Sequence, residues 1–108
     1  ADAPAPDAGT IWDLASLTKV VAMTSAVLRL VDQGKVSLDA PVQRYLPAFH
    51  GPRKARVTVR HLLTHTSGLP SWRPLHKEAE TPAARRALVL ATPLDTVPGA
   101  RYVYSDLG

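Results

Sequence analysis

The stretch ASLTKVVAMTSAVLRLV, residues 15–31, is apolar around most of a helical circumference and contains a serine and a lysine near its start. Its spacing predicts one helix over residues 16–33. Gly34, followed by Lys35, is typical of the residue that ends such a helix. A helix that is apolar on most sides is usually covered on several of them. The stretch therefore predicts a helix buried within a larger packed body.

Ser16 and Lys19 stand three positions apart at the start of this helix. That spacing brings two side chains onto one face, within hydrogen-bonding reach. A serine needs a base to become a nucleophile, and apolar surroundings would lower the pKa of Lys19 toward a usable value. Free backbone N–H groups at the helix start could stabilise an oxyanion. The alternative is an ordinary capping serine beside a solvated lysine. Asp13 either orients the turn before Ser16 or caps the helix.

The rest of the chain reads as short helices joined by proline-rich loops, with no convincing sheet. Residues 1–10 are predicted to be a loop or linker, and residues 71–80 are polar and irregular. Residues 100–105 read as an extended piece. Three further helices are predicted. The first covers residues 41–46 with Asp39 as its cap, and the last covers residues 82–91 with Thr81 as its cap. Between them, a helix of two turns begins after Thr58 and stops at Gly68.

Composition bounds the class of protein. The 108 residues allow at most one domain, and a hydrophobic content of 45% with a charged content of 20% is typical of a globular chain. Cysteine is absent, which excludes disulfides and thiolate chemistry. No membrane span is predicted, and a net charge of +4 without a long basic stripe does not favour nucleic-acid binding. Neither a cofactor nor a subcellular location is indicated.

Three stretches, taken together, resemble a known enzyme family. IWDLASLTKVV with LRLVDQGKVSLDAPVQRYLP is similar to the nucleophile region of serine β-lactamases and penicillin-binding proteins, for which S-x-x-K is a signature. VTVRHLLTHTSGLP and PGARYVYSDLG resemble the segments that follow in the branch containing class C β-lactamases, D-alanyl-D-alanine carboxypeptidases and family VIII carboxylesterases. The resemblance implies an α+β, β-lactamase/transpeptidase-like fold. Residues 1–108 would be a partial domain carrying mainly the helical part and lacking most of the antiparallel sheet.

The resemblance also implies roles for individual residues. Ser16 would be the acylated nucleophile, Lys19 its proton partner and Tyr104 the general base or proton relay. Asp106 stands where many relatives have Asn, in a substrate-binding position. A carboxylate cannot donate a hydrogen bond to a substrate carbonyl as an amide does, which favours an ester substrate. Trp72 is a candidate wall for the acyl group.

The function implied is that of a serine hydrolase that works through an acyl-enzyme. A carboxylesterase ranks first, a D,D-peptidase second and a β-lactamase third, and a non-catalytic binding or scaffold protein with the same fold is the alternative. The family's third motif, Lys-Thr-Gly or His-x-Gly, is expected after residue 108. The rest of the domain would then be required, and the chain alone is expected to be inactive and to fold poorly.

The remaining clusters have simpler interpretations. His61 and His65 have the i, i+4 spacing of a zinc pair, but Leu62 stands where a metalloprotease motif needs Glu. No metal site is therefore predicted, and both histidines are expected to make structural hydrogen bonds. The basic loop at residues 50–56 is expected to be solvated. Tyr102 competes with Tyr104 for the motif position, and only the spacing to Asp106 favours Tyr104.

Overall fold

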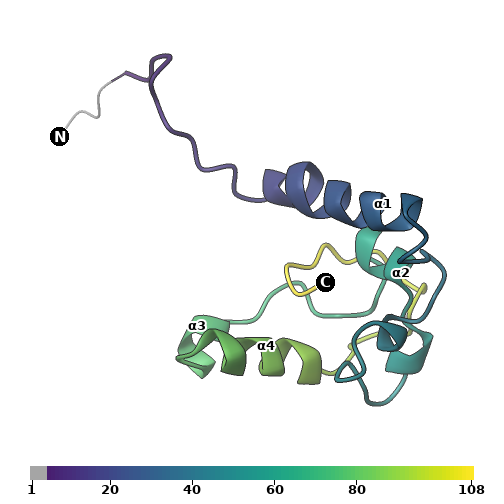
Figure 1. Ribbon diagram of the computed structural model, residues 1–108. Coiled ribbons are helices and arrows are strands. Elements are labelled where there is room, and N and C mark those ends of the chain that lie inside the picture. Colours follow the sequence, from purple (N-terminus) through teal and green to yellow (C-terminus); the bar gives the residue numbers. More distant parts are fainter. Residues whose placement is uncertain (1–4) are drawn as a thin grey trace.

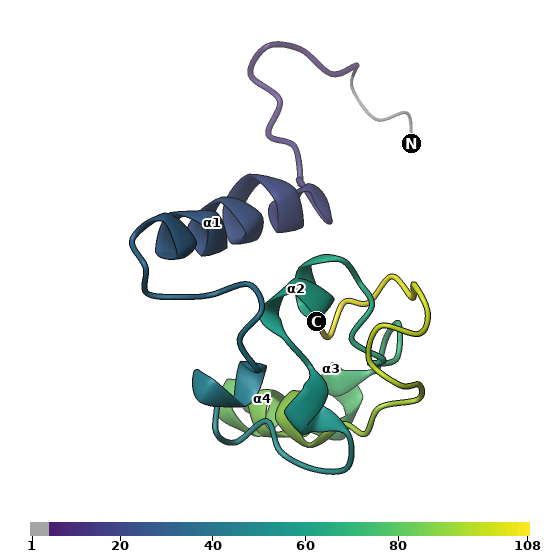
Figure 2. The ribbon, with the colours of Figure 1, turned by 90° about the vertical axis from the view of Figure 1, so that its right-hand side faces the viewer.

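The computed structural model describes residues 5–108 (Figure 1). One long helix lies above a body of shorter helices and loops, and the N-terminal arm extends away from both (Figures 1 and 2). The α-helices are α1 (Ser25–Asp32), α2 (Val59–Leu63), α3 (Leu75–Glu78) and α4 (Pro82–Ala91). A π-helix, Lys19–Thr24, runs directly into α1, and two short 3₁₀ helices cover Val42–Arg44 and Lys54–Arg56.

The first helix agrees with the predicted range but contains an unexpected π segment. The Thr24 hydroxyl donates to the Lys19 carbonyl at 2.7 Å, which spans the wider turn of the π-helix. Gly34, with φ of 67°, ends the helix as predicted. The Gly34 and Lys35 amides donate to the carbonyls of Val31 and Leu30, both at 2.9 Å, in the pattern of a Schellman motif.

Within the described part of the chain this helix is largely exposed, so its burial against the rest of the domain stays a prediction. Val20 and Val21 are each 60% exposed, and Leu28 is 50% exposed. Figure 2 shows α1 set above the other helices rather than enclosed by them. The periodic apolar pattern fixes a helix, but burial depends on a partner surface, and no element within residues 5–108 covers these side chains.

Two of the three predicted caps are confirmed. The Thr58 side chain accepts from the His61 amide at 3.2 Å, and the His61 ring accepts in return from the Thr58 amide. Thr81 likewise accepts from the Ala84 amide at 3.2 Å. The Asp39 cap is wrong, because its carboxylate instead accepts from Arg60 at 2.7 and 3.0 Å. The helix predicted over 41–46 is only the 3₁₀ turn at Val42–Arg44.

Helix α2 ends five residues before the predicted stop at Gly68. His65 takes the left-handed conformation there, with φ of 55°. Its amide donates to Leu62 O at 3.2 Å and the Thr66 amide donates to His61 O at 2.9 Å, which is again a Schellman motif. Glycine usually holds this position, although histidine is among the residues enriched in it.

Helix α3 lies in the segment predicted to be irregular. Arg73, just before the helix, donates to the Glu78 carboxylate from Nε at 2.9 and 2.8 Å and from Nη2. Arg73 also donates to Thr92 Oγ1 at 3.0 Å. These contacts close one short turn against the end of α4, an arrangement that periodicity alone does not reveal.

A small core lies beneath α1 and holds the body together. It contains five buried apolar side chains from loops and short helices: Val42, Phe49, Val57, Leu69 and Leu94. Within residues 5–108 the only strand-like pairing is an isolated bridge between Pro41 and Thr58, so the described part is helical.

The α+β class of the whole fold and the division into domains stay predictions. Residues 1–4 of the predicted linker lie outside the described residues, and none of the described helices is long and apolar enough to cross a membrane.

Candidate active site

The loop after α2 holds the C-terminal segment in place. Backbone amides of the C-terminal segment donate to carbonyls in residues 65–71, each at 2.8 Å. The pairs are Asp95 to Gly68, Gly99 to Thr66, Val103 to His65, and Asp106 to Ser71. The segment containing THTSGLP therefore supports the segment containing YVYSD, although the two lie far apart in sequence.

Ser105 anchors the second motif. It is only 1% exposed, its hydroxyl donates to Pro70 O at 2.7 Å, and its amide donates to His65 Nδ1 at 3.1 Å. Because this middle residue is fixed inward, the side chains of Tyr104 and Asp106 on either side of it face outward. Both reach Lys19 of the first helix.

Lys19 is the centre of the site. Its ammonium lies 3.3 Å from Ser16 Oγ, 2.6 Å from Asp106 Oδ1 and 5.0 Å from the centroid of the Tyr104 ring. The predicted reach between Ser16 and Lys19 is thus confirmed. The structure also brings Tyr104 and Asp106 to the same lysine, although 85 or more residues separate them from it in the sequence.

A strained turn leads into Ser16. The Asp13 carboxylate accepts from the Ala15 amide at 2.8 Å, and Ala15 has a φ of 43°, in the left-handed region that side chains rarely adopt. Asp13 therefore orients the turn, as the first of its two interpretations predicts. Strain of this kind persists where the surrounding structure fixes it, and it is common beside reacting groups.

The pKa of Lys19 moves in the opposite direction to the prediction. The hydrogen bond to Asp106, followed by that to Tyr104, raises the pKa of the lysine above its usual value and outweighs the effect of burial. The apolar neighbours that were expected to lower it lie mostly on exposed faces of the helix. In this arrangement Lys19 is a cation, and a neutral lysine base is disfavoured.

Tyr104 shows the complementary change. Hydrogen bonding to Ser16, and then to Lys19, lowers the pKa of the phenol below its usual value. A cation beside the ring oxygen stabilises the phenolate, which is the condition a tyrosine base requires. The pair therefore combines a lysine that retains its proton with a tyrosine that releases one more readily.

Three of the amides at the helix start, those after Ser16, are already hydrogen-bonded. The amides of Leu17, Thr18 and Lys19 donate to the carbonyls three residues earlier, at 2.9, 3.1 and 3.0 Å. Tight turns rather than open N–H groups thus precede the helix. This corrects the expectation of free amides for Leu17, Thr18 and Lys19, whereas oxyanion stabilisation by the Ser16 amide stays a prediction.

Two predicted site residues lie at the margin. Trp72 is 60% exposed and follows Ser71, whose carbonyl accepts from the Asp106 amide, so its backbone is close to the site. Tyr102 is 68% exposed and meets the His65 ring edge-on, with centroids 6.0 Å apart. Tyr104, rather than Tyr102, therefore faces Lys19.

Sequence reasoning missed the part played by His65. Its ring stacks at a tilt on Tyr104, with centroids 4.5 Å apart, while its Nδ1 accepts from the Ser105 amide. The expectation that both histidines make structural hydrogen bonds is confirmed, since His61 Nδ1 accepts from the Thr58 amide at 3.2 Å. No sequence signal connected His65 with Tyr104, because the contact depends on the packing of two distant loops.

The remaining predictions concern metal ligands and the basic loop. Among residues 5–108 no group of three or more His, Cys, Asp or Glu side chains is arranged to hold a metal ion.

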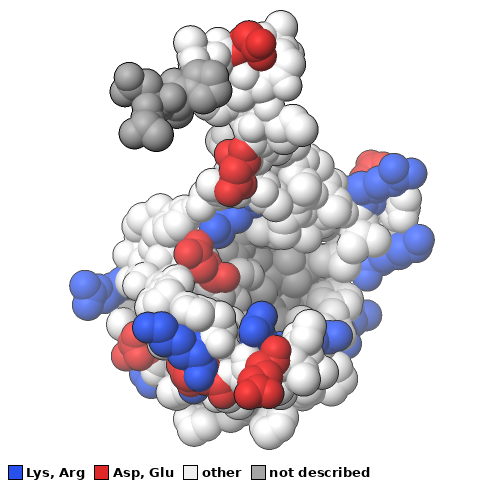
Figure 3. Space-filling view, turned by 90° about the vertical axis from the view of Figure 1, so that its left-hand side faces the viewer, with Lys and Arg blue, Asp and Glu red and all other residues white. Residues whose placement is uncertain are grey.

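The loop at residues 50–56 was expected to be solvated, but Lys54 is only 2% exposed, because its ammonium donates to the Leu90 carbonyl of α4. On the face drawn in Figure 3, basic and acidic groups are interspersed around a central hollow.

Comparison with known proteins gives three informative relatives. Esterase EstB of Burkholderia gladioli is 56% identical over 58% of this chain and 17% of its own length. N-acetylmuramyl-L-alanine amidase of Bacillus subtilis strain 168 is 36% identical over 92% of this chain and 25% of its own length. An Escherichia coli K12 protein with the provisional name D-alanyl-D-alanine carboxypeptidase is 31% identical over 92% of this chain and 26% of its own length. The chain thus spans about a quarter or less of the length of these relatives.

The family assignment follows from the whole length of the chain rather than from one motif. The family model described as Beta-lactamase matches residues 1–108, which include the S-x-x-K lysine and the Tyr-Ser-Asp segment that the structure brings together. The chain belongs to the β-lactamase family, which also includes the penicillin-binding-protein-like enzymes.

Proposed function

We propose that the full-length protein is a serine hydrolase whose nucleophile is Ser16. The observation that carries this proposal is the position of the Lys19 ammonium, which contacts Ser16 Oγ, the Tyr104 ring and the Asp106 carboxylate. A serine, a cation and a tyrosine with a lowered pKa form a nucleophile, a proton-holding group and a base. The names of the relatives, an esterase, an amidase and a carboxypeptidase, support the same class of reaction.

In the proposed reaction Tyr104 acts as the base and Lys19 stays protonated. The Tyr104 phenolate accepts the proton of Ser16 as Oγ attacks the substrate carbonyl carbon. The proton then passes to the departing alcohol as the bond between the carbonyl carbon and the alkoxy oxygen breaks. In the second half, Tyr104 takes a proton from water, the hydroxide attacks the acyl carbon, and the proton returns to Ser16 as the acid leaves.

The proposed substrate class is a carboxylic ester. Asp106 has a carboxylate where an amide donor would help to bind a peptide or β-lactam carbonyl, and that carboxylate is paired with Lys19 at 2.6 Å. The esterase relative is also the most identical of the three over its aligned region. Trp72, which is exposed and lies next to Ser71 beside the Asp106 loop, would form the acyl wall.

Amide hydrolysis by a D,D-peptidase is the second candidate. The specific observation in its favour is coverage, because the amidase and carboxypeptidase relatives each align with 92% of this chain while the esterase aligns with 58%. A β-lactamase ranks third. Comparing kcat/KM for a short-chain p-nitrophenyl ester, a D-alanyl-D-alanine peptide and nitrocefin separates the three.

Covalent labelling tests the proposal itself. A fluorophosphonate should phosphonylate Ser16 with loss of fluoride, and mass spectrometry of the digested full-length protein should place the added mass on that residue. Ser16→Ala should abolish both the label and ester turnover, whereas Ser25→Ala, a serine on the same helix, should leave both intact. Folded protein that takes up neither a fluorophosphonate nor a penicillin would instead support the non-catalytic alternative.

A further inference from the structure

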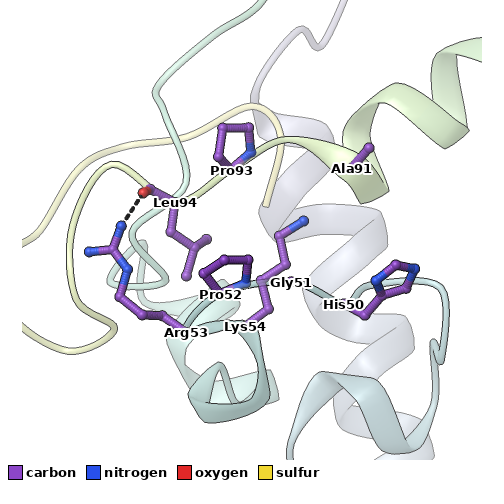
Figure 4. A pocket seen from close by; sticks show the side chains of 8 residues that line it. All are labelled: His50, Gly51, Pro52, Arg53, Lys54, Ala91, Pro93 and Leu94. Atoms are coloured by element: carbon purple, nitrogen blue, oxygen red, sulfur yellow. Dashed lines mark hydrogen bonds between the residues drawn. The ribbon is translucent and has the colours of Figure 1, made fainter.

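Two basic side chains hold the end of α4 through backbone carbonyls, at a distance from the candidate site. Lys54 donates to Leu90 O and Arg53 donates to Leu94 O, each at 2.6 Å. A cavity of about 250 Å³ lies here, and Figure 4 shows the two side chains on different sides of Leu94. None of the candidate catalytic residues lines this cavity. The first helix, rather than this cavity, carries the side chains that organise the candidate site.

The first helix turns one narrow face toward the body of the molecule. Four of its side chains from residue 19 to residue 31 are half-buried, and the others in this range are exposed. The four are Lys19, Thr24, Val27 and Val31. The last three are spaced three and four residues apart, as neighbours on one face of an α-helix are. Lys19 stands five residues before Thr24, where α-helical spacing would place Val20 or Val21 on this face.

The π segment explains the spacing of five. Five steps of about 100° along an α-helix leave two side chains roughly 140° apart. An α-helix with Thr24 facing the body would therefore point Lys19 away from it. A π-helix bonds residues that are five apart, so the wide turn at Lys19–Thr24 brings both residues onto one face. On that face the Lys19 ammonium reaches Asp106 at 2.6 Å and lies over the Tyr104 ring.

The Thr24 hydroxyl spans the wide turn. It donates to Lys19 O, five residues back, at 2.7 Å. Thr64 and Thr92, by comparison, donate to carbonyls four residues back, at 2.9 and 2.7 Å. Four residues is the usual reach of a threonine hydroxyl in an α-helix. The bond made by Thr24 therefore belongs to the π geometry and would not form in a regular helix.

Side-chain packing does little to hold this wide turn. No residue of the π segment is buried within the described part of the chain, and Val20 and Val21 are each 60% exposed. We infer that Thr24 is a positioning residue whose hydroxyl holds the wide turn, and that this turn directs the Lys19 ammonium to Asp106 and Tyr104. The expected effect on turnover rests on the proposed function, whereas the expected geometry does not.

A crystal structure of the full-length Thr24→Val protein tests the geometry. Valine keeps the shape of threonine but removes the donor. We expect residues 19–24 to become α-helical and the distance from Lys19 Nζ to Asp106 Oδ1 to exceed about 4 Å. Thr24→Ser, which keeps the hydroxyl, should keep the contact. Persistence of the wide turn or of the contact in Thr24→Val would overturn the inference, whether or not Ser16 is a nucleophile.

Kinetics of the same variants test the consequence for the site. Thr24→Val should lower kcat for a p-nitrophenyl ester and the rate of fluorophosphonate labelling at least tenfold, with little change in KM. Thr24→Ser should recover most of this loss. Ser25→Ala is the matched control, because the exposed Ser25 hydroxyl reaches Val20 O only at 3.4 Å, and it should change either rate less than twofold.

The pH profile separates this role from a general loss of stability. Asp106 and then Tyr104 raise the pKa of Lys19, so loss of these contacts should move the alkaline limb of kcat/KM to lower pH. Ser16 and then Lys19 lower the pKa of Tyr104, so loss of the lysine should move the acid limb to higher pH. The profile of Thr24→Val should therefore narrow from both sides. Equal losses in Thr24→Val and Ser25→Ala, or a lower rate with both limbs unchanged, would overturn the inference.

Discussion

At the scale of single residues, the contact between Lys19 and Asp106 determines which group holds the proton before the proposed reaction. The carboxylate raises the pKa of Lys19, while Ser16 and Lys19 lower the pKa of Tyr104. Activity should fall at low pH as the phenolate is protonated, and at high pH as Lys19 loses its charge. The pH range of activity is therefore bounded by the pKa of Tyr104 on the acid side and by the pKa of Lys19 on the alkaline side.

Asp106→Asn should move both limbs of the pH profile to lower pH. Without the carboxylate the pKa of Lys19 falls, which lowers the alkaline limb. The carboxylate also repels the phenolate, so its removal lowers the pKa of Tyr104 further and extends the acid limb. The measurement is kcat/KM for a p-nitrophenyl ester across pH. Asp95→Asn, an exposed carboxylate elsewhere in the chain, is the matched control, and unchanged limbs in Asp106→Asn would contradict the assignment.

His65 should affect turnover through Tyr104 rather than through its own chemistry. His65→Gly suits the left-handed backbone but removes the ring that contacts Tyr104 and accepts from Ser105. We expect kcat to fall about tenfold, equivalent to about 1.4 kcal/mol, with little change in KM. His65→Asn also suits this backbone and supplies a side-chain acceptor, so it should recover part of the loss. Equal activity of the Gly and wild-type proteins would exclude this positioning role.

Residue-level prediction succeeded where the chemistry is local. The Ser16–Lys19 contact follows from helical spacing, and it is present at 3.3 Å. The direction of the Lys19 pKa was wrong because it depends on Asp106, which packing brings from the far end of the sequence. The burial of Lys54 was missed for the same reason, since its acceptor is on α4.

At the scale of elements, boundaries set by local hydrogen bonds were predictable. Thr58 and Thr81 cap α2 and α4, and Gly34 ends α1. Two other elements could not be predicted, because no apolar period stabilises them. A hydroxyl-to-carbonyl hydrogen bond stabilises the π segment at Lys19–Thr24, and an Arg73–Glu78 ion pair stabilises the short helix α3.

Gly68 is the glycine that leaves the least room for a side chain. A Cβ there would lie 2.4 Å from Thr96 O, and φ is +86°. Gly68→Ala should therefore separate the loop after α2 from the segment that carries Tyr104, costing more than about 3 kcal/mol of unfolding free energy. Gly34→Ala has similar strain, with φ of +67°, but open space, and should cost about 1–2 kcal/mol.

Urea unfolding of the full-length protein measures both costs, and ester turnover provides a second readout. Gly68→Ala should lower turnover as well as stability because the motif loop shifts, while Gly34→Ala should lower stability alone. Equal costs for the two variants would show that contact with Thr96 does not restrict this position.

At the scale of the whole molecule, the sequence predicted a helical body, but the source of its burial lies beyond local pattern. The core beneath α1 comes from loops and short helices, whereas the first helix leaves its apolar side chains exposed. An apolar period can specify that a helix needs a covering surface. It cannot say which part of a protein supplies that surface.

Leu28 provides a test of whether the first helix is covered in the full-length protein. In a chain of residues 1–108 alone, this side chain is 50% exposed, so Leu28→Lys should leave stability almost unchanged and should reduce binding of the dye ANS. That isolated chain should bind ANS strongly, unfold without a sharp transition and show no ester turnover.

In the full-length protein, where the family fold implies a covering sheet, the same substitution should cost more than about 2 kcal/mol in urea unfolding, because it would bury an unpaired charge. Arg29→Gln, an exposed neighbour on α1, should change neither protein by more than about 0.5 kcal/mol. A full-length protein that tolerates Leu28→Lys as well as the isolated chain would show that the apolar helix stays open to solvent, and the predicted need for the rest of the domain would then be wrong.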